Sequence, residues 1–110
     1  MTKALFFRDD TGAFAGFSVK GHSGLSSEGS DILCAAISSM AQLVINTLTE
    51  DFGCKLEVFV DAEAAEIKAM LSEENNSLNA ARALINGFYR ELSVLQKAYP
   101  KNLSVREKSI

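Results

Sequence analysis

The first twenty residues alternate between apolar and polar side chains and predict a β-hairpin. Residues 3–8 and 13–20 are expected to be strands, and residues 9–12, Asp-Asp-Thr-Gly, have the composition of a tight turn. Successive side chains of a strand point to opposite faces, so the second strand divides into two sets. One face is expected to carry Ala13, Ala15, Phe17 and Val19, and the other Phe14, Ser18 and Lys20.

Residues 55–61 and 64–71 predict a second hairpin by the same alternation, with its turn at Asp61–Glu63. The side chains expected to point inward are Leu56, Val58 and Val60 on its first strand and Ala65, Ile67, Ala69 and Leu71 on its second. Leu103 and Val105 mark a short final strand.

Residues 31–50 have apolar side chains at helical spacing and predict a helix. Ser30 or Asp31 can cap its start, and Gly53 follows its end. Two stripes run along this segment, so we expect it to be covered on two sides. The first stripe consists of Ile32, Ala36, Met40, Leu43 and Thr47, and the smaller second stripe of Asp31, Cys34, Ser38, Ala41 and Ile45.

Residues 77–99 predict a second helix, which Pro100 ends. Gly87 inside it indicates close packing against a neighbour, because glycine costs about 1 kcal/mol relative to alanine in a helix interior. The apolar face of this helix is expected to consist of Leu78, Ala81, Ile85, Phe88, Leu92 and Leu95.

The element order ββαββαβ predicts a two-layer α/β sandwich, with both helices on one face of a largely antiparallel sheet. A chain of 110 residues has room for one domain, residues 1–110. The net charge of −3 argues against a dedicated nucleic-acid binder, so we expect no direct contact with nucleic acid. We identify neither an apolar stretch of 18 residues nor a signal peptide, and expect a cytoplasmic protein without a membrane partner.

The residues that could carry out catalysis lie near the two ends of the segment 21–30. His22 is the only histidine, and Cys34 follows twelve residues later, in the expected first turn of the helix. A thiol is a strong nucleophile as the thiolate, which a helix N-terminus and a neighbouring imidazole stabilise. Asp31 and Ser38 share the stripe of Cys34, where an orienting carboxylate and a hydroxyl would be useful. Residues 21–30, with three glycines and four serines, are expected to form a gate that sets the distance between His22 and Cys34.

These residues also have non-catalytic interpretations. A helical cysteine is more often a small buried apolar residue, and a lone histidine after a strand is more often a loop residue. Asp31 is most simply a helix cap, and Ser38 a tolerated polar residue within the helix. Cys54 is interpreted as structural. One histidine without clustered carboxylates does not supply a zinc site, so we expect neither a metal nor a cofactor.

Two motifs flank residues 25–28: Gly21-His22-Ser23-Gly24 and, from Gly29 to Ser38, Gly-Ser-Asp-Ile-Leu-Cys-Ala-Ala-Ile-Ser. Together they resemble the Prp family of ribosomal-processing cysteine proteases of Firmicutes and related bacteria. Ser23 and Leu33 are mild departures from the commoner Ala and Val. The resemblance in length and element order covers nearly the whole chain, but its specificity lies in residues 21–38.

The resemblance implies an endopeptidase that removes a short N-terminal extension from a large-subunit ribosomal protein. Cys34 would be the nucleophile and His22 the general base that then protonates the leaving amine. Cleavage after aromatic residues implies an apolar groove beside Cys34, and family members form homodimers, which would cover the second stripe of the helix. Supporting or substrate-binding roles would fall to Gly21, Gly24, Asp31 and Ser38.

Two other classes of function compete with a protease. A non-catalytic, ribosome-associated module would bind a peptide and use Cys34 only for packing. A redox or small-molecule thiol enzyme is disfavoured because no resolving cysteine lies beside Cys34 and no glycine-rich phosphate-binding motif is present.

Overall fold

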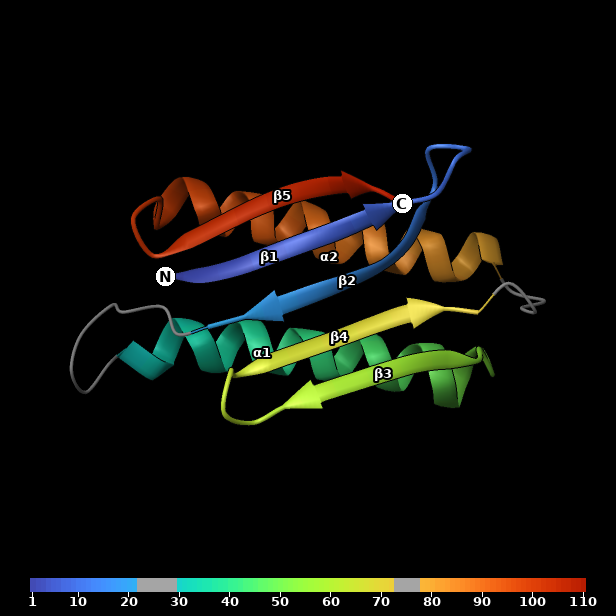
Figure 1. The fold of residues 1–110 in the computed structure, drawn as a ribbon, viewed down its shortest axis with the longest axis horizontal. Helices are drawn as coiled ribbons and strands as arrows, with labels where there is room; N and C mark the ends of the chain where they lie inside the picture. Colours follow the sequence, from blue (N-terminus) through green and yellow to red (C-terminus); the bar gives the residue numbers. More distant parts are fainter. Residues whose placement is uncertain (22–29, 73–77) are drawn as a thin grey trace.

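The protein forms a five-stranded sheet with both helices against one of its faces (Figure 1). The computed structural model describes residues 1–21, 30–72 and 78–110, apart from the side chains of Ser30 and Asp31. The element order is the predicted ββαββαβ, and the two-layer architecture is confirmed. The elements are β1 (Thr2–Arg8), β2 (Phe14–Lys20), α1 (Ser30–Asn46) with a π-helical turn η1 (Thr47–Asp51), β3 (Leu56–Asp61), β4 (Glu66–Leu71), α2 (Leu78–Ala98) and β5 (Leu103–Ser109).

The strands follow the order β3-β4-β2-β1-β5 across the sheet. Both hairpins and the β2–β4 pair are antiparallel, whereas β5 runs parallel to β1, so the sheet is largely antiparallel as predicted. In Figure 1, α2 lies behind β5, β1 and β2, and α1 lies behind β4 and β3. The opposite face of the sheet carries neither helix.

A β-bulge in β2 changes which side chains reach the core. Phe6 pairs with Phe17, but two residues later Arg8 pairs with Phe14, which leaves Ala15 as an extra residue. Phe14 therefore lies on the same side as Phe17 and is 4% exposed, with its ring centroid 5.9 Å from that of Phe6. The prediction that Phe14 faces away from Phe17 is wrong, because alternation fails where a bulge inserts a residue.

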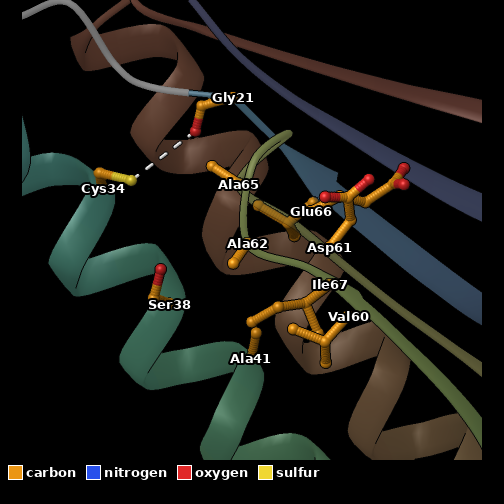
Figure 2. A pocket seen from close by; sticks show the side chains of 11 residues that line it. Gly21, Cys34, Ser38, Ala41, Val60, Asp61, Ala62, Ala65, Glu66 and Ile67 are labelled. Atoms are coloured by element: carbon orange, nitrogen blue, oxygen red, sulfur yellow. Dashed lines mark hydrogen bonds between the residues drawn. The ribbon is translucent and has the colours of Figure 1, made fainter.

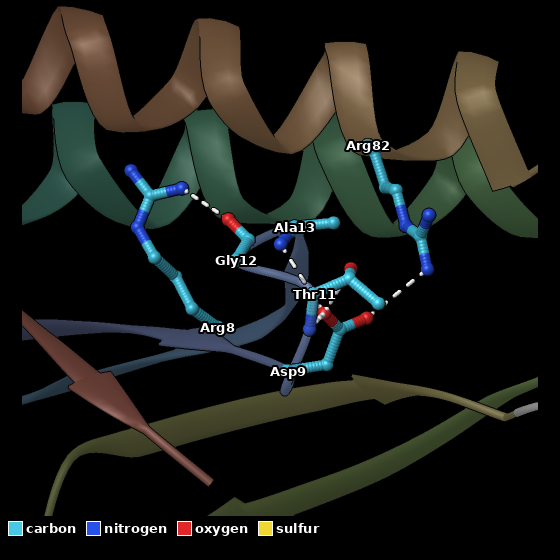
Figure 3. Close-up of polar contacts among 6 residues, drawn as sticks. All are labelled: Arg8, Asp9, Thr11, Gly12, Ala13 and Arg82. Atoms are coloured by element: carbon cyan, nitrogen blue, oxygen red, sulfur yellow. Dashed lines mark hydrogen bonds and ion pairs between the residues drawn. The ribbon is translucent and has the colours of Figure 1, made fainter.

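Asp9 organises the turn between β1 and β2 (Figure 3). Its Oδ1 accepts hydrogen bonds from the Thr11 hydroxyl at 2.6 Å and from the amides of Thr11 and Ala13 at 2.9 and 3.2 Å. Arg82 of α2 donates to Oδ2 at 3.1 Å and so ties the turn to the helix layer. The Thr11 hydroxyl above all, with the two amides and the Arg82 charge, lowers the pKa of Asp9, although desolvation opposes this.

The face of α1 that packs on the sheet is not the predicted main stripe. Ile32 and Leu43 of that stripe are 70% and 63% exposed. The smaller stripe lies closer to the sheet, since Ala41 and Ile45 are buried. A helix that is apolar on nearly every side gives no periodic signal to separate these faces. The buried side chains of α1 and η1 are Leu33, Ile37, Ala41, Val44, Ile45 and Leu48.

The helical segment Ile32–Asp51 is long and apolar enough to cross a membrane by length and composition, so the prediction that the chain has no such apolar stretch is wrong. Within the structure, 33% of the most apolar part of this segment is buried. Ile37 and Ala41 are fully buried in the core, and core helices satisfy the same criterion of length and composition.

The predicted apolar face of α2 is confirmed, since Ala81, Ile85, Phe88 and Leu92 are buried. The Phe88 ring packs edge-on against Phe17, with centroids 5.0 Å apart. Gly87 does not make the close contact that we predicted. A Cβ added there would meet only the Arg90 guanidinium, at 3.9 Å.

β3 is an edge strand that is more exposed than its pattern predicted. Val58 and Val60 face the helix side, as their partners Ala69 and Ile67 do, but they are 47% and 63% exposed because β3 is the last strand of the sheet, at the margin of the helix layer. Phe59, on the other face, is 54% exposed. The hairpin turns at residues 62–65, a little later than predicted.

Candidate active site

Three of the six predicted site residues meet at one end of the sheet. Gly21, at the end of β2, lies beside Cys34 and Ser38 of α1 (Figure 2). His22, Gly24 and the rest of the predicted gate from residue 22 to 29 lie outside the described residues. Asp31 is in the first turn of α1, but its side chain is not described either. The contact between His22 and Cys34 therefore stays a prediction.

Cys34 is the fifth residue of α1, so it begins the second helical turn rather than lying in the first. Its side chain is partly buried, and its Sγ–H donates a hydrogen bond to the Gly21 carbonyl oxygen at 3.7 Å. Ser38 follows one turn later and lines the same pocket. The predicted stripe of Cys34 and Ser38 thus faces the end of β2.

The backbone of Gly21 requires glycine for two reasons. Its φ of 95° is a left-handed conformation, and a Cβ at this position would lie 2.8 Å from the Met1 carbonyl oxygen. Its amide donates a hydrogen bond to the Ala65 carbonyl oxygen at 3.1 Å. Gly21 is thereby held between α1 and the β3–β4 turn. This places the residue before His22 within reach of the Cys34 thiol.

An apolar pocket of about 150 Å³ opens beside Cys34. Its apolar walls are formed by Val19, Ala41, Val60, Ala62, Ala65 and Ile67. The carboxylates of Asp61 and Glu66 lie on the far side of it from Cys34 (Figure 2). Each carboxylate has a partner elsewhere: Asp61 accepts amides of its own turn, and Glu66 accepts the Ser18 hydroxyl at 3.2 Å. The pocket matches the apolar groove expected next to the thiol.

The β3–β4 turn is the part of the site that sequence reasoning missed. Ala62 and Ala65 line the pocket, and Ala65 holds a φ of 50° without being glycine. Only methyl groups project from these positions, which leaves room for a ligand side chain. An alanine-rich turn where Gly or Asn is usual was the available signal.

The second thiol has a different environment. Cys54 is 7% exposed in the core, and burial raises the pKa of its thiol. The structural interpretation of Cys54 is consistent with this position. Among the described residues, no group of three His, Cys, Asp or Glu side chains is placed to hold a metal ion.

A partly buried thiol beside an apolar pocket, near the start of a helix in an α/β sandwich, fits a cysteine-dependent enzyme. A family model described as cysteine protease Prp matches residues 1–104. The chain therefore belongs to the Prp family of cysteine proteases, as its motifs had indicated.

Solved structures share the whole fold. SMU.848 from Streptococcus mutans is 25% identical with a TM-score of 0.87, over 100% of this chain and 96% of that one. The essential ribosomal processing protease Prp of S. aureus was solved with a covalently linked product peptide and with a substrate peptide. These two structures are 18% and 16% identical to this chain, each with a TM-score of 0.85 over 98% of this chain and 100% of that one. None of the curated proteins compared with the chain matches it.

Proposed function

We propose that this protein is an endopeptidase that removes the N-terminal extension of a large-subunit ribosomal protein in the cytoplasm. Cys34 is the nucleophile and His22 the general base and acid. The observation that carries this proposal is the Cys34 thiol at the wall of an apolar pocket, in a chain of the Prp cysteine protease family. The S. aureus relative, solved with peptides, is a ribosomal processing protease, which supports the choice of substrate.

The reaction begins with removal of the thiol proton of Cys34, which is hydrogen-bonded to the Gly21 carbonyl oxygen. The carbonyl of Gly21 accepts the Sγ–H, so the thiol proton points toward the strand end that precedes His22 in the chain. His22 takes this proton as the sulfur attacks the scissile carbonyl carbon, and returns it to the leaving amine as the peptide bond breaks. Water, deprotonated by His22, then hydrolyses the thioester and restores the thiol.

The oxyanion formed during each attack needs hydrogen-bond donors. The first four amides of an α-helix have no intrahelical acceptor, and α1 begins at Ser30, four residues before the nucleophile. These amides are our candidates for the oxyanion site. Asp31 and Ser38 act in support, and Gly21 and Gly24 shape the chain on either side of His22.

The pocket beside Cys34 accepts an apolar side chain of the extension next to the bond that is cut. Its walls are apolar, and the carboxylates of Asp61 and Glu66 point away from it and have other partners. The aromatic side chain that precedes the proposed cleavage point is the expected occupant of this pocket.

A homodimer is part of the proposal. Exposed apolar side chains lie on α1 and along the β3 edge, where a second copy would cover them. The surface of α1 available for this is the stripe of Ile32 and Leu43, because the stripe of Cys34 faces the pocket. This differs from the second stripe, which the family resemblance implied would be covered in the dimer.

The test is to incubate the protein with the extended ribosomal-protein precursor of its own organism and read the precursor's N-terminus by mass spectrometry. We expect one cut, lost in Cys34→Ser and retained in Cys54→Ser, the matched control for thiol loss. Cleavage by Cys34→Ser at the normal rate would overturn the thiolate mechanism. Peptide binding without cleavage by the wild-type protein would identify a non-catalytic peptide-binding module instead.

A further inference from the structure

The face of the sheet that carries no helix is divided by charge. Ala4 and Phe6 of β1 are buried under the helix layer, so the intervening positions point to the opposite face. Across β5, β1 and β2, the pairing register puts four cations on this face: Lys3, Lys20, Arg106 and Lys108. We call this set the basic half-face. The acidic residues of the same face lie on β4 and β3, at Glu66, Glu57 and Asp61.

The basic half-face is not neutralised by neighbouring side chains. Its four cations are exposed, and none of them forms an ion pair with another residue of the described ranges. Lys3 and Lys20 lie directly opposite each other in the β1–β2 register, an unfavourable placement for like charges. Glu66 lies across from Lys20 at the border with the acidic residues, and its carboxylate accepts the Ser18 hydroxyl rather than forming an ion pair with Lys20. Four of the eleven Lys and Arg residues thus gather on one patch of a chain whose net charge is −3.

Leu5, the large apolar residue between these cations, is only partly exposed. Phe7 and Ser18 on the same face are 6% and 7% exposed, and Lys68 covers Phe7 with its ammonium 5.2 Å from the ring centroid. A membrane-binding surface inserts exposed apolar side chains beside its cations, which this patch lacks. A flat array of cations suits a ligand with regularly spaced phosphates.

We propose that the basic half-face binds the phosphate backbone of RNA. The choice of RNA among phosphate polymers rests on the proposed function, because the proposed substrate is a ribosomal protein, a component of an RNA-containing particle. The Cys34 pocket lies on the helix side of the sheet, so peptide and RNA occupy opposite faces. The sequence analysis argued against nucleic-acid binding from the net charge of −3, but a net charge averages over both faces of the sheet and does not show a local basic patch.

The experiment measures the affinity of the full chain for a labelled single-stranded RNA of about 12 nucleotides by fluorescence anisotropy over a salt series. Lys3→Gln/Arg106→Gln removes two charges from the basic half-face. Each lost phosphate contact should weaken binding about fivefold at about 0.1 M salt, so the double variant should lose about 25-fold. The slope of log K against log salt should become shallower by about 1.4.

The matched control is Arg90→Gln/Lys97→Gln, which removes two exposed charges from α2. We expect its RNA affinity to stay within about twofold of the wild type, since it keeps every contact of the basic half-face. Equal losses in the two double variants would overturn the assignment of this face, as would wild-type protein that does not bind RNA. Binding to phosphatidylglycerol vesicles but not to RNA would assign a membrane surface instead.

Cleavage of the isolated precursor peptide, measured without RNA, separates this inference from the proposed function. Lys3→Gln/Arg106→Gln should cleave the peptide at the wild-type rate while losing RNA affinity. Absence of cleavage by the wild type, with RNA binding intact, would overturn the protease proposal and leave the phosphate site standing.

Discussion

The thiol of Cys34 donates a hydrogen bond to the carbonyl oxygen of Gly21 at 3.7 Å. The amide of the same glycine donates to Ala65 at 3.1 Å. One residue thus connects α1, the end of β2 and the β3–β4 turn, three segments that are distant in sequence. The geometry of the candidate site depends on this residue as much as on the nucleophile.

We predict that Gly21→Ala destabilises the fold by about 2–4 kcal/mol and abolishes cleavage. Alanine is strained at a φ of 95°, and its Cβ would lie 2.8 Å from the Met1 carbonyl oxygen. Gly12→Ala is the matched control, because Gly12 has a φ of 83° with nothing within 4 Å of the added Cβ. Urea denaturation should show a smaller loss for Gly12→Ala. Equal losses would mean that the Met1 contact does not matter.

Alkylation should distinguish the two thiols. Iodoacetamide at neutral pH is expected to modify Cys34 well before Cys54, which is 7% exposed and whose pKa is raised by burial. Peptide mapping by mass spectrometry identifies the modified residue, and Cys54→Ala should leave the fast phase unchanged. If His22 contacts the thiol as proposed, His22→Ala will slow the modification of Cys34. An unchanged rate would argue against that contact.

Filling the pocket should impair cleavage without affecting the fold. Ala62→Phe places a ring where Ala62 points toward the pocket, and we expect kcat/KM for the precursor to fall at least about tenfold (Figure 2). Ala64→Phe is the control in the same turn, since Ala64 does not line this pocket. Similar effects of the two substitutions would show that turn distortion, rather than occupancy, is responsible.

Gly87→Ala should raise the free energy of unfolding by about 0.5–1 kcal/mol. The helix gains alanine's higher propensity, and the added methyl meets only the flexible end of Arg90. Chemical denaturation of the two proteins measures the difference. A loss of stability would indicate that Gly87 packs against a partner, such as a second copy of the chain.

The acid dependence of stability should include a contribution from Asp9. Its pKa is lowered in the folded state, so the carboxylate stabilises the fold above the ordinary value of 3.8, and this is lost as the pH falls through the lower folded value. Asp9→Asn keeps an oxygen for the Thr11 and Ala13 donors but removes the charge that pairs with Arg82. Its stability should be lower at pH 7 and change less between pH 5 and 2. Parallel pH profiles would contradict this role.

The elements were predictable because turn residues and periodicity are local signals, and these located all five strands and both helices. Tertiary effects produced the errors. Phe14 faces the core because the bulge at Ala15 shifts the alternation, and Val58 is exposed because β3 is the edge strand of the sheet. In the site, helical spacing put Cys34 and Ser38 together correctly. The alanine-rich composition of the β3–β4 turn was visible in the sequence, but its place in the site was missed because no local pattern reveals that β4 pairs with β2.

The approach of Met1 to Gly21 has a practical consequence for handling the protein. The N-terminus lies at the end of the sheet where the pocket opens, whereas the C-terminus lies at the other end, with the Ile110 amide bonded to the Arg8 carbonyl (Figure 1). A purification tag fused before Met1 would crowd the entrance used by a substrate. The same tag placed after Ile110 would be remote from it, so C-terminal fusions are the better choice for activity assays.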